Sequence, residues 1–189
     1  MMNSTWARTA PRIAILADSL ARWTGGIDFL RLCISALNSV SPETRWSILL
    51  PSKSIPKSLV VLGKNGLKTL VGMEANPLPP ISRDKLIDTL TSSGIRIDII
   101  DYRDTVSRLA SAMRQCRAEV LFPCANSLGS AFPLPWIGYV PDLQHKRLPH
   151  WFSERERMAR DKVFSRILAE APAVVVNSAA AAKDIVGKA

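Results

Sequence analysis

The sequence has little of what a metal centre or a disulfide framework needs. It holds only three cysteines and two histidines among its 189 residues. The cysteines are odd in number, lie far apart and form no CxxC pair: Cys33, Cys116 and Cys124. We therefore expect neither a metal site nor disulfides, and we interpret the three thiols as reduced and mostly buried.

Common catalytic and cofactor-binding motifs are also missing. The chain has no GxSxG nucleophile elbow, no GxxxxGK[ST] phosphate loop and no HExxH metalloprotease motif. A GxGxxG fingerprint is absent too, because Gly25 and Gly26 stand seven and eight residues past Asp18 rather than directly after a strand. We expect no conventional nucleophilic catalysis and no cofactor.

Long apolar runs and concentrated positive charge are equally scarce. No apolar run approaches the roughly 20 residues that span a bilayer. The opening MMNSTWARTAPR lacks the apolar core of a secretory signal, so we expect a cytoplasmic protein. The net charge of +9 is spread over both halves without a block of five basic residues. This favours a polyanionic ligand or peripheral contact with an anionic membrane over a nucleic acid.

One lysine set could mark such a membrane contact. If residues 53–68 were a single helix, its lysines would share one face: Lys53, Lys57, Lys64 and Lys68. Gly63 and Gly66 interrupt that helix, and no apolar face opposes the lysines. We therefore favour a solvated face.

What the chain does contain is an alternation of apolar runs with amphipathic segments. Runs typical of buried parallel strands occupy residues 12–18, 45–51, 95–101, 118–124, 135–140 and 173–178. Helices are predicted after a Gly25–Gly26 turn and at residues 82–94, 105–116, 153–171 and 179–186. Their expected apolar faces include Ile27, Leu30, Ile34 and Leu37 in the first helix and Val163, Ile167 and Leu168 in the fourth. The fourth helix also begins with a capping box, Ser153 and Glu156.

This alternation predicts an α/β, Rossmann-like three-layer domain with a mostly parallel sheet. We expect a flexible N-terminus over residues 1–11 and a single domain over residues 12–189. Residues 52–80, which end in a proline cluster, are interpreted as an irregular insertion.

Two candidate sites lie where predicted strands end. Asp142 and His145 follow the strand at 135–140, where polar side chains can bind sugar hydroxyls and a histidine can titrate near neutral pH. The alternative is that Asp142 caps the next turn and that His145 is a solvated loop residue. Gly25 and Gly26 either form a plain turn or let a phosphate or sugar approach bare backbone N–H groups.

Four stretches, in order, carry a resemblance to a known family. They are RIAILADSLARWTGGIDFLRLCISALNS, RWSILLPS, YVPDLQHKRLPHWFSERERMARDKVFSRIL and AVVVNSAAAAKDIV. Together they resemble the N-terminal half of GT-B glycosyltransferases. The likeness is greatest to the retaining family that contains sucrose-phosphate synthases and bacterial mannosyl- and glucosyltransferases. Its most specific part is the series P-D-L-Q-H, P, charged helix, V-V-V-N-S.

The resemblance implies a function and a set of site residues. In that family the N-terminal domain mostly binds a carbohydrate or lipid-linked acceptor, and a C-terminal domain holds the nucleotide-sugar donor. It implies that Gly25 and Gly26 approach the donor's diphosphate or sugar, and that Asp142 and His145 line the transfer site. It further implies that Asn177 and Ser178 sit on the cleft rim and that Lys146 and Arg147 assist an anionic acceptor. Backbone N–H groups and cations stabilise a leaving diphosphate without a metal.

The family's donor-binding half would follow Ala189, so we expect this chain to need it, as a continuation or a separate chain, for transfer. Catalysis requires groups from both sides of the cleft. The alternatives are an inactive remnant or a non-catalytic binding module whose open face is rimmed by Trp136, Tyr139 and Trp151. A nucleic-acid binder is the weakest reading.

Overall fold

The computed structural model describes residues 10–17, 20, 24–51, 83–92, 94–102 and 105–187. These residues form the strands β1 (Arg12–Leu16), β2 (Arg45–Pro51), β3 (Ile97–Tyr102), β4 (Val120–Cys124), β5 (Trp136–Val140) and β6 (Ala173–Val176). Each strand falls within or next to a predicted apolar run. Our predictions for residues 1–9, for the insertion at 52–80 and for its four lysines lie outside the described residues.

The strands build a single six-stranded sheet in the order β3-β2-β1-β4-β5-β6. Every neighbouring pair runs parallel. The chain moves outward from β1 to β3 and then returns to the other side of β1 with β4. The order therefore reverses between β1 and β4, which is the position where open α/β sheets bind ligands at the carboxyl ends of their strands.

The helices are α1 (Thr24–Val40), α3 (Arg83–Thr91), α4 (Val106–Gln115), α5 (Gln144–Arg147), α6 (Glu154–Glu170) and α7 (Ala179–Val186), with a short 3-10 helix at Pro149–Trp151. Three of them begin at side-chain caps. Thr105 accepts from Arg108 N–H and Ser178 from Ala181 N–H. Ser153 and Glu156 form the predicted capping box of α6.

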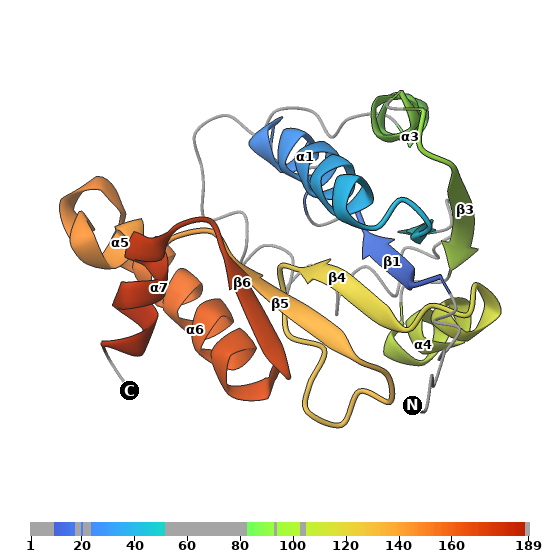
Figure 1. Ribbon diagram of the computed structural model, residues 1–189. Helices are drawn as coiled ribbons and strands as arrows, with labels where there is room; N and C mark the ends of the chain where they lie inside the picture. Colours follow the sequence, from blue (N-terminus) through green and yellow to red (C-terminus); the bar gives the residue numbers. More distant parts are fainter. Residues whose placement is uncertain are drawn as a thin grey trace, which may run out of the picture.

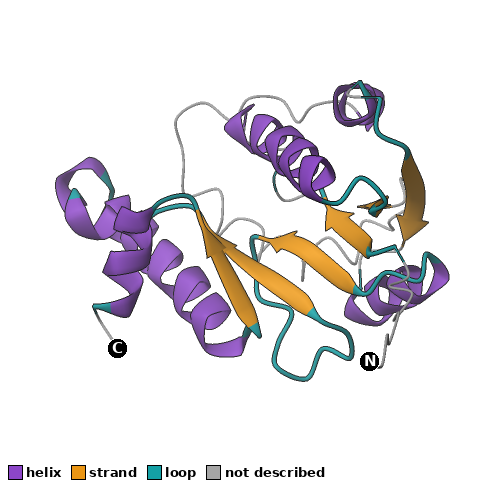
Figure 2. Cartoon of the chain, in the orientation of Figure 1, coloured by secondary structure: helices purple, strands orange, loops and turns teal. Residues whose placement is uncertain are grey.

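Helices cover both faces of the sheet (Figures 1 and 2). On one face, α1 and α3 pack against β1 and β2 around Leu30, Ile48 and Leu90. On the other, α4 packs around Leu121 and Met113. The α6 helix lies on this second face as well, around Ile167. The three layers confirm the predicted α/β, Rossmann-like fold.

The contact between β5 and α6 requires a glycine. A Cβ atom on Gly138 would lie 2.4 Å from Ile167 Cγ2 and 3.2 Å from Ala171 Cβ. Strand and helix therefore approach more closely than any side chain at position 138 allows.

Three details of the sequence reading are wrong. Gly25 and Gly26 do not form a turn before the first helix, because α1 already begins at Thr24. Leu37 and Leu168 are 40% and 39% exposed and lie outside the core. Phe164 is buried beside Val163 and Ile167 instead, because the face of α6 that packs on the sheet includes Phe164.

Candidate functional site

The carboxyl edge of the sheet gathers several of the predicted site residues. Because all strands are parallel, the residues that follow β1, β5 and β6 emerge at the same edge. Gly25 and Gly26 occupy the first turn of α1, which follows β1. Asp142 follows β5, and Asn177 follows β6. The structure thus places these four residues on one side of the molecule.

A chain of contacts connects α1 to the ends of β5 and β6. Phe29, one turn into α1, stacks on Tyr139 with ring centroids 4.3 Å apart. The Tyr139 hydroxyl donates to Asn177 Oδ1 at 2.9 Å. Burial raises the pKa of Tyr139, although the Asn177 contact opposes that shift, so the hydroxyl keeps its proton to donate. Asn177 is therefore held toward the α1 side of the edge.

Gly26 lets the backbone of Leu20 pass close to the first turn of α1. A Cβ atom at this position would lie 2.2 Å from the carbonyl oxygen of Leu20. Gly26 is buried, whereas Gly25 is half-buried. This packing gives Gly26 a structural reason to be glycine that is independent of any ligand.

Asp142 caps the turn that follows β5. Its Oδ1 accepts the Gln144 backbone N–H at 3.0 Å and lies 3.9 Å from Arg160 of α6. The Arg160 guanidinium also lies over the Phe152 ring, 4.7 Å from its centroid. The capping alternative for Asp142 is confirmed, and its half-buried carboxylate still borders solvent.

His145 is not the solvated loop residue that one interpretation expected. It lies on the short α5 helix, is only 1% exposed, and packs edge-on against Phe164. Its Nε2 lies 3.0 Å from Asp161 Oδ1 of α6. The imidazole therefore points toward α6, whereas Tyr139 and Asn177 lie on the α1 side. The turn that carries Asp142 therefore lies between His145 on the α6 side and Asn177 on the α1 side.

The environment keeps His145 neutral and Asp161 ionised. Burial lowers the pKa of His145 below its usual 6.5, and the contact with Asp161 offsets only part of that shift. For Asp161, partial burial acts upward, but hydrogen bonds from Lys146 and His145 lower its pKa overall. A neutral imidazole beside a carboxylate carries its proton on Nε2, so Nδ1 is left as an acceptor.

The basic residues of the turn are already paired with acids. Lys146 Nζ lies 2.7 Å from Asp161 Oδ1. Arg147 forms a two-pronged contact with Asp184 of α7, with Nε–Oδ2 at 2.6 Å and Nη2–Oδ1 at 2.5 Å. This contact raises the pKa of Arg147. Ser178, predicted on the cleft rim, serves as the N-cap of α7.

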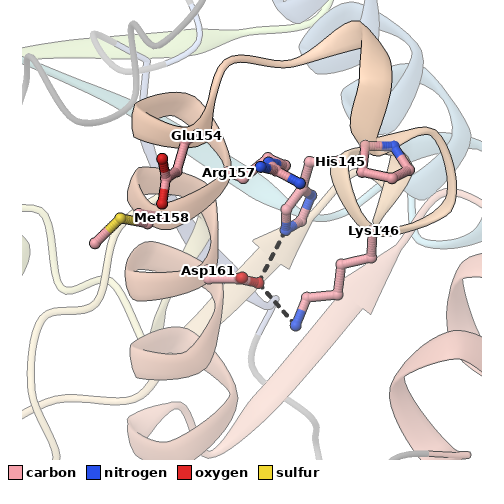
Figure 3. A pocket seen from close by; sticks show the side chains of 7 residues that line it. His145, Lys146, Glu154, Arg157, Met158 and Asp161 are labelled. Carbon is pink, nitrogen blue, oxygen red and sulfur yellow. Dashed lines mark hydrogen bonds and ion pairs between the residues drawn. The ribbon is translucent and has the colours of Figure 1, made fainter.

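A pocket of about 440 Å³ opens between α5 and α6 (Figure 3). It is lined by His145, Lys146, Pro149, Glu154, Arg157, Met158 and Asp161. Sequence reasoning did not identify Arg157 or Asp161 as site residues. The spacing of Glu154, Arg157, Met158 and Asp161, at i, i+3, i+4 and i+7, marks one helix face and could have identified them.

Four further findings bear on the sequence expectations. Trp136 and Tyr139 are buried, so they do not rim an open face, whereas Trp151 is 73% exposed. All three cysteines are free thiols, but only Cys124 is buried, and burial raises its pKa to about 12. Within the described ranges, no three His, Cys, Asp or Glu side chains gather in a way that could hold a metal ion. No helix in that part of the chain is long and apolar enough to cross a membrane.

Comparison of the chain with protein-family models, with curated proteins and with solved structures gave no match.

Proposed function

We propose that this chain is the acceptor-side half of a retaining GT-B glycosyltransferase, completed by a donor-binding domain. The observation that carries the proposal is the gathering of α1, Asp142 and Asn177 at the carboxyl edge of a parallel sheet with the order β3-β2-β1-β4-β5-β6. That edge is where doubly wound folds bind nucleotides and sugars.

Each part of the edge has a task in this proposal. The first turn of α1 offers backbone N–H groups and the positive end of a 17-residue helix to the departing diphosphate. The Asp142 carboxylate and the Asn177 amide hydrogen-bond the hydroxyls of the sugars. His145, which is buried and bonded to Asp161, acts as a positioning residue for the turn that carries Asp142. Ser178 fixes the start of α7 at the rim.

The acceptor side requires less positive charge than the sequence suggested. Lys146 and Arg147 each bond to an acid, and Asp142 lies near Arg160. The turn after β5 therefore carries charges that are largely balanced locally. This balance supports a carbohydrate or lipid-linked acceptor whose reacting end is neutral.

The test is a reconstitution of transfer. The donor half is sought in the source cell by mass spectrometry, as peptides that continue past Ala189 or as a co-purifying chain. The two halves are then mixed with labelled nucleotide-sugars and simple glycosides, and the anomeric configuration of any product is read by NMR. We expect retention of configuration in the mixture and no transfer by the 189-residue chain alone.

A matched pair of variants tests the site assignment. Asp142→Asn keeps an oxygen for the turn but removes the charge, and we expect it to lower transfer about 100-fold. Asp98→Asn makes the same change at an exposed acid near the start of β3, at the opposite edge of the sheet, and should leave transfer unchanged. Equal activity of the two variants would refute the role of Asp142.

A non-catalytic interaction module is the second candidate function. It is favoured by exposed apolar side chains on α1 and β6, among which Leu32 is 64% and Val40 is 84% exposed. Light scattering across a range of concentrations separates the two candidates. Self-association in the micromolar range would favour the module, whereas a monomer that binds a donor half would favour the transferase.

A further inference from the structure

The pocket between α5 and α6 contains one hydrogen-bond donor and one acceptor that no described residue satisfies. His145 Nδ1 and Arg157 Nε are both buried and have no hydrogen-bond partner. Both residues line the pocket, and Figure 3 shows the imidazole and the guanidinium projecting into the space between the two helices. The His145 side chain is fully buried, with 0% of its surface exposed.

The chemistry of the two atoms differs, and this difference restricts the ligand. Nε2 of His145 donates to Asp161, so Nδ1 has a lone pair and needs a donor. Arg157 Nε always carries a hydrogen and needs an acceptor. A carboxylate or a phosphodiester could satisfy only Arg157, and an ammonium group could satisfy only His145. A hydroxyl group both donates and accepts, so a ligand with hydroxyls can satisfy both atoms.

The charges around the pocket also favour a neutral ligand. Two cations, Lys146 and Arg157, face two carboxylates, Glu154 and Asp161, and Lys146 is already bonded to Asp161 at 2.7 Å. An anion would meet repulsion from both carboxylates, and a cation would meet repulsion from both bases. The carboxylate oxygens, in contrast, accept readily from hydroxyls.

The pocket has an apolar side as well. Pro149 and Met158 line it, and Met158 is 66% exposed. The ring of a sugar or cyclic polyol presents C–H groups on its faces and hydroxyls around its edge. Such a ring can therefore cover the apolar side while its hydroxyls face the charged side.

We propose that this pocket binds a neutral polyhydroxylated ring, a sugar or a cyclic polyol, through hydroxyls that reach His145 Nδ1 and Arg157 Nε. Both atoms are shielded from solvent, so binding moves the partly buried Arg157 side chain aside. An unpaired buried polar group destabilises the folded chain, and the ligand's hydroxyls remove that destabilisation. The proposal concerns equilibrium binding by this chain alone, on the α6 side of the turn, and goes beyond the transfer reaction proposed above.

The experiment uses the full chain with its histidine rings labelled with ¹⁵N. The sequence contains only two histidines, so the exposed His150 serves as an internal control. Titration with methyl α-D-glucopyranoside, methyl α-D-mannopyranoside or myo-inositol should shift the His145 Nδ1 resonance in a saturable way and leave His150 unchanged. The same titration is repeated with inorganic phosphate and with N-acetylglycinamide.

Two arginine variants on α6 complete the test. Arg157→Met keeps the aliphatic stem but loses the donor, and we expect about tenfold weaker binding, the loss of one hydrogen bond from a charged group. Arg155→Met changes an exposed arginine of the same helix outside the pocket and should bind like the wild type. Thermal unfolding verifies that both variants are folded.

Several results would overturn the proposal. A stronger response to phosphate would make the pocket an anion site, and a response to the amide alone would make it a peptide site. If no probe shifts His145 Nδ1, the two atoms are satisfied by water only. Equal affinities of Arg157→Met and Arg155→Met would remove Arg157 from the site.

Discussion

Replacing His145 by alanine should destabilise the protein far more than the same change at His150. His145 is 1% exposed, and its imidazole bonds to Asp161 at 3.0 Å and contacts the Phe164 ring at a centroid distance of 5.6 Å. His150 is exposed. The two variants therefore remove the same chemical group from opposite environments.

The expected loss follows from three contributions. A hydrogen bond to a charged group contributes about 1.5–3 kcal/mol, and the lower end applies because Lys146 still satisfies Asp161. Lost packing and the cavity left behind cost about 2–3 kcal/mol. Removing the unpaired Nδ1 recovers about 1 kcal/mol. The free energy of unfolding should thus fall by about 3 kcal/mol, or about 6–12 °C in Tm.

The assay is urea unfolding followed by far-ultraviolet circular dichroism. His150→Ala should stay within about 0.5 kcal/mol of the wild type. His145→Gln retains a side-chain N–H for Asp161 and should lose only about half as much as alanine. A double-mutant cycle with Asp161→Ala should give a coupling of about 1.5 kcal/mol. If His145→Ala is as stable as His150→Ala, the imidazole does not hold the turn to α6, and its positioning role is refuted.

Three further predictions concern stability. The folded state lowers the pKa of His145 below its usual 6.5, so the unfolded chain binds this proton at a higher pH than the folded chain does. The free energy of unfolding should therefore be constant above about pH 7 and fall as the pH drops below 6.5. His145→Gln should abolish this fall, which urea midpoints measured across the pH range would show. Stability that rises on acidification through this window would contradict the reasoning. Gly138→Ala should lower the free energy of unfolding by about 2–3 kcal/mol in thermal unfolding, because the new methyl group would lie 2.4 Å from Ile167 Cγ2. If this variant is as stable as the wild type, β5 and α6 can separate without cost. Ser153→Ala should cost about 1 kcal/mol through the lost cap of α6, whereas Ser153→Asp should restore most of it; equal losses would exclude a capping effect.

The sequence was a good guide to elements whose signals are local. Each strand corresponds to a short apolar run, and the capping box placed the start of α6 at its observed residue. The start of α1 was misjudged for a physical reason. Paired glycines usually mark a turn, but Gly26 is needed here because the Leu20 carbonyl passes too close for a Cβ atom. That contact joins backbone atoms six residues apart, and the pattern of apolar residues does not reveal it.

The same reasoning explains which parts of the site could be predicted. The position of Asp142 follows from the end of its predicted strand, since all carboxyl ends of a parallel sheet meet at one edge, whereas Asn177 was expected there only from the family resemblance. The burial of His145 could not be read in this way. Its partner Asp161 lies sixteen residues further along the chain, on a helix whose orientation is set by packing on β5. Periodicity also overestimated the apolar face of α6, which reaches Phe164 but not Leu168.

The pairing of charges around the turn after β5 changes where a polyanionic partner should be sought. The net charge of +9 suggested such a partner, and the family resemblance implied that Lys146 and Arg147 assist an anionic acceptor. Both side chains bond to carboxylates of later helices, Asp161 in α6 and Asp184 in α7. A cation that is already paired gains little from an added anion, because the new contact must compete with the old one. The turn after β5 therefore offers little free positive charge to an anion, and it suits a ligand that carries hydroxyls and little charge.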